Sequence, residues 1–276
     1  MNKTLKDKVV FITGASSGFG ADTARHFARQ GSIVVLAARR MDRLTGLAGE
    51  IIAAGGQAFA VSLDVSQQTQ IDVAVQSVLE KFGRIDILLN NAGMSRLDWL
   101  ERLDPAVDID TAIDVNLRGV IQCTRAVLPS MLKRRTGQII NMSSVAGMIA
   151  APMYSVYAAT KFGMRGFTDG LRREVAPFGI QVSGLYPGPA TTGFGSQSGD
   201  NALKKNIKVP RWLYMTSDYV ARRTVRLARH PSRTLILPWW FGPLVGLDTV
   251  FPGLVDWLVN VVFVNRFHHP PTEGEP

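Results

Sequence analysis

The sequence predicts a doubly wound α/β fold, in which a mostly parallel sheet of about seven strands carries helices on both faces. Short β-branched runs alternate with longer amphipathic stretches from Val9 to Leu185, the pattern of parallel strands joined by crossover helices. A glycine-rich turn follows the first of these runs directly. Apolar residues make up 46% and charged residues 19% of the 276 residues, so the chain can bury a large core.

Each element follows from the period of its apolar residues. The expected strands are Val9–Thr13, Ile33–Ala37, Ala58–Leu63, Ile85–Asn90, Gly137–Met142, Ile180–Leu185 and Thr234–Leu237. The expected helices are Ala21–Gln30, Arg43–Ala54, Gln67–Phe82, Asp110–Lys133, Val156–Pro177 and Tyr219–Arg229. The strands are short and bounded by turn residues, whereas the helices repeat apolar residues at helical spacing. No linker or internal repeat interrupts this order, so residues 1–276 are expected to form a single domain.

Two segments after Leu185 depart from the alternation. Residues 188–216 are rich in glycine, proline, serine and asparagine and are too long for an ordinary connection, which predicts a substrate lid. Ser217 and Asp218 are typical helix starts, and they precede the last predicted helix. Residues 238–276 form an apolar C-terminal extension. Proline, aspartate and asparagine interrupt its apolar runs, so we expect no transmembrane anchor there.

The cysteine and histidine content excludes several classes of protein. Cys123 is the one cysteine of the chain, which rules out an internal disulfide framework and fits a reducing, cytoplasmic compartment. Because it falls in a predicted helix, Cys123 is expected to be buried rather than catalytic. The four histidines are scattered or lie near the proline-rich end, so no metal site is predicted. The N-terminal apolar run leads into glycines and is interpreted as a strand, not a signal peptide.

The glycine-rich turn predicts a dinucleotide site. The first strand ends in Thr13-Gly14-Ala15-Ser16-Ser17-Gly18-Phe19-Gly20, and a helix follows. Glycines let the backbone approach a pyrophosphate, and the free N–H groups at the start of a helix attract its charge.

The end of the second strand predicts which dinucleotide binds. A carboxylate at that position accepts hydrogen bonds from the adenosine ribose of NAD, but this chain has Ala38, Arg39 and Arg40 instead. A guanidinium pairs with a 2′-phosphate. We therefore expect NADP(H) as the cofactor.

A tyrosine and a lysine with catalytic spacing follow the fifth predicted strand. Tyr157 and Lys161 are four residues apart, and so lie on one face of the predicted helix. A nearby cation favours the phenolate form, so Lys161 is expected to lower the pKa of Tyr157. Ser143 and Ser144 end the strand before this helix, and Asn90-Asn91-Ala92-Gly93 follow the fourth strand.

With these motifs together, residues 5–195 resemble the short-chain dehydrogenase/reductase family, whose fold is Rossmann-like. The family's catalytic set matches Asn116, Ser144, Tyr157 and Lys161. Its cofactor-binding positions match Gly14, Ser16, Ser17, Gly18, Phe19, Gly20, Arg39, Arg40, Asp64, Val65, Asn91, Ala92, Gly93, Tyr157, Lys161, Pro187, Gly188 and Thr192. Pro189-Ala190 depart from the bulkier apolar residue that the family more often has there.

The resemblance implies a mechanism. Tyr157 would give a proton to a carbonyl oxygen that Ser144 holds, while NADPH gives hydride to the carbonyl carbon. Lys161 would lower the tyrosine pKa and hold the nicotinamide ribose, and Asn116 would anchor a water relay to solvent. Run backwards, the same groups oxidise an alcohol.

Three functions are compatible with the sequence. The first is an NADP(H)-dependent oxidoreductase for a ketone or secondary alcohol on an apolar molecule, because Met148, Ile149, Met153 and Tyr154 lie between Ser144 and Tyr157. The second is a 3-oxoacyl thioester reductase, whose anionic carrier would meet the basic residues described next. The third is a nucleotide-sensing regulator or scaffold without catalysis. The four catalytic groups favour the enzymes.

Charge and aromatic residues concentrate in the C-terminal third. The net charge is +9, and nine basic residues stand against Asp218 between Asn201 and Arg233. This segment could face solvent, an anionic substrate or an anionic membrane; nucleic acid is not expected because no recognisable reading module is present. Trp212, Trp239, Trp240 and Trp257 fall in the same third. They predict a substrate tunnel, an interface of a homo-dimer or homo-tetramer, or a peripheral membrane contact through residues 211–267.

Overall fold

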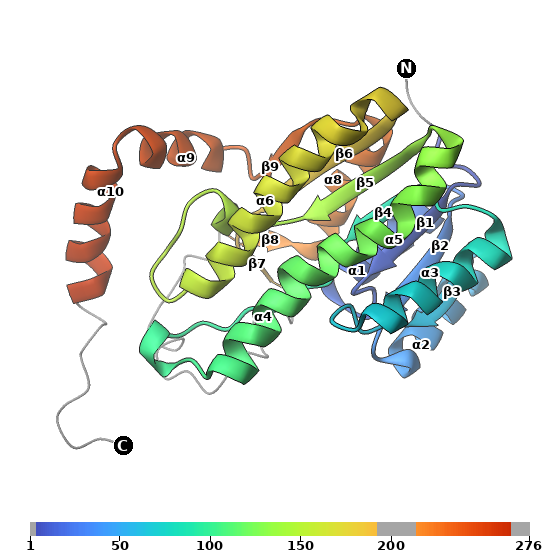
Figure 1. The fold of residues 1–276 in the computed structure, drawn as a ribbon, viewed down its shortest axis with the longest axis horizontal. Helices are drawn as coiled ribbons and strands as arrows, with labels where there is room; N and C mark the ends of the chain where they lie inside the picture. Colours follow the sequence, from blue (N-terminus) through green and yellow to red (C-terminus); the bar gives the residue numbers. More distant parts are fainter. Residues whose placement is uncertain (1–3, 192–213, 266–276) are drawn as a thin grey trace.

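A seven-stranded parallel sheet forms the centre of the molecule. The computed structural model describes residues 4–191 and 214–265, and its sheet has the strand order β3-β2-β1-β4-β5-β6-β9. The strands are β1 (Val9–Thr13), β2 (Ile33–Ala38), β3 (Gln57–Ser62), β4 (Ile87–Asn90), β5 (Gly137–Met142), β6 (Ile180–Pro187) and β9 (Thr234–Leu237). Every neighbouring pair in this sheet is parallel. The predicted Rossmann-like α/β fold is confirmed (Figure 1).

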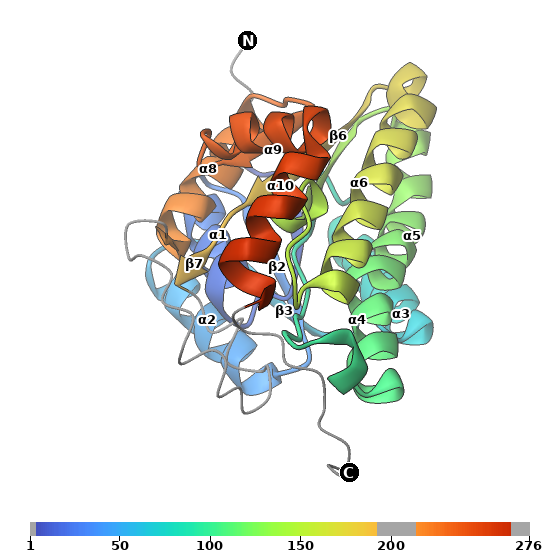
Figure 2. The same cartoon turned by 90° about the vertical axis from the view of Figure 1, so that its left-hand side faces the viewer.

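Helices cover both faces of the sheet (Figure 2). One layer contains α1 (Gly18–Ala28), α2 (Met41–Ala53) and α8 (Ser217–Arg229), and the other contains α3 (Gln68–Phe82), α5 (Gly119–Arg134) and α6 (Ser155–Val175). Successive side chains of a strand point to opposite faces. In β1, Val10 and Ile12 therefore pack with the first layer, whereas Val9 and Phe11 pack with the second. A strand buried on both faces is expected to be largely apolar, and in β1 Val9, Val10, Phe11 and Ile12 are apolar.

The predicted helix Asp110–Lys133 is not uniform. Its course is divided among a π-helical turn, η2 (Pro105–Asp110), the short helix α4 (Thr111–Ile113), a second π-helical turn, η3 (Asp114–Arg118), and α5. A π-helical turn carries one more residue than an α-helical turn and locally re-aims the side chains. Here that turn contains Asn116.

The two segments after β6 have local structure of their own. Ala190–Thr191 (β7) pairs with Met215–Thr216 (β8), so the two ends of the predicted lid are joined; residues 192–213 between them lie outside the described part. After β9, the C-terminal extension forms α9 (Phe241–Val250), α10 (Pro252–Val259) and a π-helical turn, η8 (Asn260–Val264).

A buried carboxylate ties the amino end of the sheet together. Asp86, just before β4, is 7% exposed and accepts a hydrogen bond of 2.9 Å from the Val9 N–H. Its oxygens also lie 3.0 Å from Arg84 Nε and 3.3 Å from Arg134 Nη1. Burial raises the pKa of Asp86, but the Val9 hydrogen bond and the nearby cations outweigh it, so the pKa is lower than usual.

We expect Asp86→Asn to lower the free energy of unfolding by about 1–3 kcal/mol, because charged hydrogen bonds are lost at a buried position. Since the folded pKa is lowered, this contribution is present above the ordinary carboxyl pKa and disappears as the pH falls through the folded value. Urea denaturation at neutral and acidic pH measures it. Equal stability of the variant and the parent protein at neutral pH would contradict this role.

Candidate active site

The predicted site residues converge on the carboxyl edge of the sheet. The glycine turn follows β1, Asn91 follows β4, Ser144 follows β5 and Gly188 follows β6. These four strands are neighbours in the sheet. The chain order reverses between β1 and β4, and the crevice outside such a reversal is where open α/β sheets bind their ligands.

The glycine turn is packed too tightly for side chains. Gly14 has a φ of +67°, and a Cβ there would lie 2.8 Å from Ala92 Cα. A Cβ on Gly20 would lie 2.5 Å from the Gly14 carbonyl oxygen. The N-cap residue of α1, Ser17, makes no side-chain capping bond in the structure. No side-chain cap from Ser17 therefore occupies the first N–H groups of α1, and a phosphate that binds there would have no such cap to displace.

The Asn90–Gly93 segment is held against the glycine turn by Thr13. The Thr13 hydroxyl accepts hydrogen bonds of 3.0 Å from the N–H groups of Asn91 and Ala92. Asn91 Nδ2 donates to the Thr13 carbonyl oxygen at 2.9 Å. Asn90 Nδ2 donates instead into the sheet, to Asn141 Oδ1 at 2.9 Å. These bonds fix the position of the loop that resembles the family's NNAG element.

The two arginines after β2 take different positions. Arg40 Nη2 donates hydrogen bonds of 2.9 Å to both the Ser16 and the Ser17 hydroxyls. Arg39 extends into solvent, with its side chain 68% exposed and its Nη1 3.9 Å from Asp64 Oδ2. The structure thus brings Ser16, Ser17 and Arg40 together, with Arg39 beside Asp64. This places two positive charges at the end of the site where the sequence predicts the adenosine ribose.

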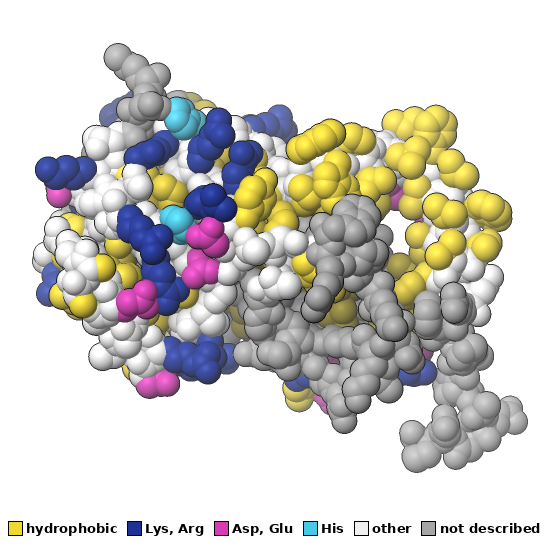
Figure 3. All heavy atoms as spheres, turned by 180° about the vertical axis from the view of Figure 1, so that it is seen from behind, with side chains coloured by type: hydrophobic (Ala, Val, Ile, Leu, Met, Phe, Trp, Pro, Cys, Tyr) yellow, Lys and Arg dark blue, Asp and Glu magenta, His cyan; other side chains and the backbone are white. Residues whose placement is uncertain are grey.

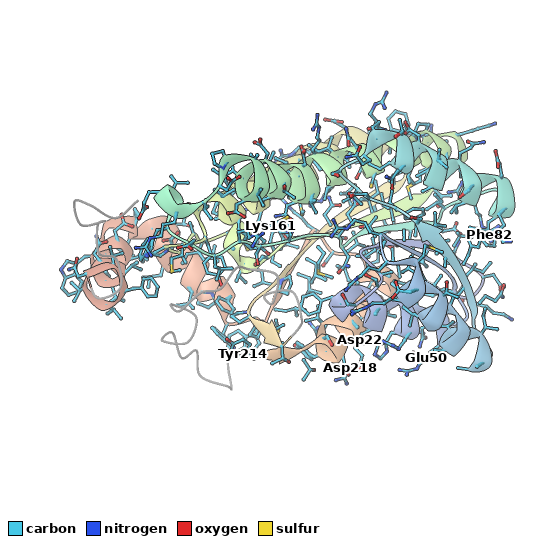
Figure 4. All side chains as sticks on the ribbon, turned by 90° about the horizontal axis from the view of Figure 1, so that it is seen from below. Asp22, Glu50, Phe82, Lys161, Tyr214 and Asp218 are labelled. Atoms are coloured by element: carbon cyan, nitrogen blue, oxygen red, sulfur yellow. The ribbon has the colours of Figure 1, made fainter. Side chains whose placement is uncertain are left out.

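Ser144, Tyr157 and Lys161 form one cluster at the ends of β5 and α6. Tyr157 and Lys161 are 8% and 3% exposed. The Ser144 and Tyr157 side chains are hydrogen-bonded to each other. Lys161 Nζ donates to the Met142 carbonyl oxygen at 3.2 Å and lies 5.6 Å from the centre of the Tyr157 ring. Figure 4 shows Lys161 inside the molecule, away from the labelled acidic residues of α1, α2 and α8.

Burial sets the pKa values of this cluster. Burial raises the pKa of Tyr157 above its ordinary value, and the hydrogen bond with Ser144 offsets only part of that rise. Burial also lowers the pKa of Lys161 to about 7. The expectation that Lys161 lowers the tyrosine pKa is therefore wrong for the chain by itself, because desolvation weakens the lysine charge and disfavours the phenolate. Tyr157 is a neutral O–H group at neutral pH, the form that donates a proton.

Asn116 lies in the π-helical turn η3 and connects two parts of the site. It is fully buried. Its Oδ1 accepts from the Met94 N–H and its Nδ2 donates to the Met94 carbonyl oxygen, both at 2.8 Å. Nδ2 also lies 3.3 Å from Thr160 Oγ1, which in turn donates to the Tyr157 carbonyl oxygen at 2.7 Å. Asn116 thus holds the loop after Gly93 against the turn of α6 that carries Tyr157 and Lys161.

Sequence reasoning missed Thr160 and Ser143. Thr160 lies between Tyr157 and Lys161 in the chain and is hydrogen-bonded to Asn116, and Ser143 Oγ donates to the Lys161 carbonyl oxygen at 3.3 Å. The position of Ser143 directly before Ser144 is a sequence signal that could have indicated a role for Ser143. Nothing in the sequence pattern distinguishes Thr160 from any other helical residue.

The predicted nicotinamide end is formed by β6 and its connection to the C-terminal extension. Ser144 Oγ lies 3.4 Å from the Pro187 carbonyl oxygen. A Cβ on Gly188 would lie 2.6 Å from Phe241 Cε2, so this phenylalanine packs directly on the glycine. Pro189 precedes β7, which begins at Ala190, and the Pro189 carbonyl oxygen accepts from the Met215 N–H at 2.9 Å. The predicted contact Thr192 lies outside the described residues.

The segment between Ser144 and Tyr157 carries buried apolar side chains. Met148 and Met153 are buried, at 7% and 6% exposure. The Tyr154 and Tyr157 rings meet edge to face with their centres 6.1 Å apart. Cys123, by contrast, lies in α5, where burial raises the pKa of its thiol to about 12. The predicted burial of Cys123 is confirmed, and such a thiol is inert as a nucleophile.

Comparison with known proteins identifies the family and agrees with the fold. Residues 8–202 match the short chain dehydrogenase family. A 3-oxoacyl-[acyl-carrier-protein] reductase from Synechocystis sp. is 37% identical over 84% of this chain and 93% of its own length.

Two solved structures extend the agreement to three dimensions. An alcohol dehydrogenase from the archaeon Thermococcus sibiricus, complexed with 5-hydroxy-NADP, is 30% identical with a TM-score of 0.74 and covers 84% of this chain and 95% of its own. A short chain dehydrogenase/reductase from Burkholderia phymatum in complex with NAD is 27% identical with a TM-score of 0.81, covering 92% and 96%. This chain belongs to the short-chain dehydrogenase/reductase family. It is an oxidoreductase that uses a nicotinamide cofactor.

We expect Lys161→Met to stabilise the protein while it damages the site. The unfolded chain holds the lysine proton up to its ordinary pKa of 10.5, but the folded chain releases it at about 7. Burying Lys161 therefore costs stability at low pH, and the cost shrinks as the pH rises. Methionine is apolar and similar in length, so Tm is expected to rise by several degrees near pH 6 and by less near pH 9. Calorimetry measures both, and a gain that does not depend on pH would contradict the burial of a lysine charge.

Proposed function

We propose that this protein is an NADP(H)-dependent oxidoreductase that interconverts a ketone and a secondary alcohol on a largely apolar molecule. The observation that carries the reaction type is the buried Tyr157 hydroxyl, hydrogen-bonded to Ser144 and next to Lys161. A nucleotide sensor or scaffold would need no such group, since burying a lysine and a tyrosine costs stability.

The residues of the carboxyl edge fit a dinucleotide. The glycine turn has no room for side chains, and α1 starts there without a side-chain cap. Gly14, Gly18, Asn91 and Lys161 would hold the cofactor along its length. When bound, NADPH supplies the hydride that the reduction requires.

The choice of NADP(H) over NAD(H) rests on Arg39 and Arg40. The Arg40 guanidinium is already held by Ser16 and Ser17, so these three side chains would meet a 2′-phosphate with little loss of side-chain freedom. The position that closes β2 is Ala38 and the next residue is Arg39, so neither supplies a carboxylate that would accept hydrogen bonds from ribose hydroxyls.

In the reduction, the chain's own residues handle the proton. Ser144 and Tyr157 both donate hydrogen bonds to the carbonyl oxygen, and the raised pKa of Tyr157 keeps its proton in place until charge develops on that oxygen. Once Tyr157 has given up its proton, Lys161 lies next to a phenolate. A positive charge at Lys161 stabilises that phenolate. With a pKa of about 7, Lys161 can also return a proton at neutral pH.

The apolar surroundings of the cluster support an apolar substrate. Met148 and Met153, which precede Tyr157 in the chain, are buried, and the Tyr154 ring packs edge to face on the Tyr157 ring. Polar substrates such as sugars would leave their hydroxyls without partners against these side chains.

A 3-oxoacyl thioester is the second candidate substrate. It is favoured by the 37% identity with the cyanobacterial 3-oxoacyl-[acyl-carrier-protein] reductase and by the excess of basic residues in the chain. NADPH oxidation with free apolar ketones and with acyl thioesters separates the two.

We expect Tyr157→Phe to abolish turnover and leave NADPH affinity close to that of the parent protein, because only the proton donor is removed. Stopped-flow fluorescence measures cofactor binding and absorbance follows NADPH oxidation. Tyr154→Phe is the matched control, since Tyr154 lies beside Tyr157 but has no assigned proton to transfer. Persistent turnover in Tyr157→Phe would refute the mechanism.

We expect Arg40→Ala and Arg39→Ala each to weaken NADPH binding by about 1–3 kcal/mol while NADH binding changes little, because a charged hydrogen bond to the 2′-phosphate is lost. The control is Arg43→Ala, which removes an exposed arginine of α2. Calorimetric titration with both cofactors measures the effect. An equal loss for NADPH and NADH would show that these arginines do not read the 2′-phosphate.

A further inference from the structure

The C-terminal arm, defined here as residues 239–264, is apolar and has no buried residue in α9, α10 or η8. Figure 1 shows it projecting from the body of the molecule beyond β9, and Figure 3 shows apolar side chains over its surface. Its charged residues are Asp248 and Asp256.

The exposed apolar side chains of the arm follow helical spacing. In α9 and just after it, Leu244, Leu247 and Phe251 are 42–56% exposed. In α10 and η8, the stripe consists of Leu254, Trp257, Leu258 and Val261, which are 52–60% exposed. Spacing of i, i+3, i+4 and i+7 is what a helix normally turns toward a core. Contiguous apolar surface of this kind marks a contact with a partner or a membrane.

The arm has no single helix that could cross a bilayer, and the two helical segments that together reach the required length and apolar composition are sharply bent. Among the described residues, no single helix is long and apolar enough to span, and α9 meets the Pro252–Val264 segment at 107°. The 10 residues of α9 extend about 15 Å, half of a hydrocarbon core of about 30 Å. A helix pair of this shape fits the interface of one leaflet, where apolar and aromatic side chains reach the acyl chains.

The charge on the same face as the arm favours a lipid surface over a second copy of this chain. Arg222, Arg226 and Arg229 are exposed on α8, where Arg222 is paired with Asp218. Figure 3 shows Lys and Arg side chains on the face of the molecule that also displays the arm, toward the opposite end of that face. An anionic lipid surface attracts such a face. In a symmetric dimer whose two-fold axis passes through the arginines of α8, the same charges would repel each other.

The arm also borders the active site. Phe241, at the start of α9, packs on Gly188, and the Phe263 ring in η8 lies 6.3 Å from the Trp99 ring, centre to centre. Both contacts lie at the carboxyl edge of the sheet, where Tyr157 is found. Docking through the arm would bring the site to the surface of the membrane.

We propose that the C-terminal arm docks this protein on an anionic lipid surface, lying in the headgroup region of one leaflet with the arginines of α8 facing lipid phosphates. Resting on the proposed function, this assigns the substrate class: an apolar ketone or alcohol dissolved in the bilayer.

The test is sedimentation of the full-length protein with vesicles of phosphatidylcholine and phosphatidylglycerol, and with phosphatidylcholine alone. We expect binding to the anionic vesicles that weakens in high salt and is absent or far weaker without phosphatidylglycerol. Leu258→Glu and Trp257→Glu should weaken binding at least about tenfold, because each removes the burial of one large apolar side chain. Arg226→Glu should weaken it at least about fivefold.

Val73→Glu is the matched control, since Val73 is 70% exposed on α3 and gains the same charge away from the arm. It should bind vesicles like the parent protein. Leu258→Glu should also keep its turnover of a water-soluble ketone, while Tyr157→Phe should bind vesicles normally without turnover.

Lack of binding to anionic vesicles would overturn the membrane proposal alone, provided that turnover of the soluble ketone persists. A dimer in light scattering that Leu258→Glu dissociates, with no vesicle binding, would assign the arm to a second copy of the chain and overturn it as well. Vesicle binding without turnover of any ketone would leave the arm's role intact and refute the proposed function.

Discussion

The burial of Lys161 beside Tyr157 is the constraint on which the site depends. Burial disfavours the charged form of the Lys161 amine and lowers its pKa to about 7, so this position costs the protein stability. Hydrogen bonds with the surrounding structure keep the amine in place. The Met142 carbonyl oxygen accepts its hydrogen bond, and Ser143 holds the backbone of the same helical turn. In the proposed reaction, Tyr157 is a phenol that keeps its proton until a substrate oxygen takes it, and Lys161 is an amine beside it that can hold or release a proton near neutral pH.

The parallel sheet stabilises this arrangement by bringing the loop residues together at its carboxyl edge. Thr13 at the end of β1 holds the loop after β4, and Asn116 joins that loop to α6 through Thr160. The cofactor end and the proton-donating end are therefore braced by one continuous set of hydrogen bonds. At the amino edge of the sheet, Asp86 contributes to stability by accepting a hydrogen bond from the first residue of β1, Val9. The C-terminal arm, packed through Phe241 on Gly188, extends the site edge toward the lipid surface that we propose.

Much of this could be predicted from the sequence. β1, β5 and β9 have their predicted bounds, because turn residues on both sides of a short run leave little choice of where the strand begins and ends. The four-residue spacing of Tyr157 and Lys161 already places both side chains on one face of a helix. The π-helical turn around Asn116 could not be predicted, since one extra residue barely changes a helical pattern. The helices α9 and α10 could not be predicted either. Their apolar residues lie on all sides of the helix, so the sequence shows only a weak helical period. The predicted direction of the Tyr157 pKa shift was wrong, because the shift is set by burial. Burial depends on tertiary packing, and the spacing between Tyr157 and Lys161 in the sequence carries no information about it.

The most direct test of the account is an NMR titration of the lysine ε-carbons in protein labelled with ¹³C-lysine, with Lys161→Met used to assign the resonance. We expect one lysine to titrate near pH 7, about where burial places Lys161, well below the other lysines. Titration of Lys161 together with the surface lysines would contradict it, because the amine would then be solvated and could not serve the buried phenol.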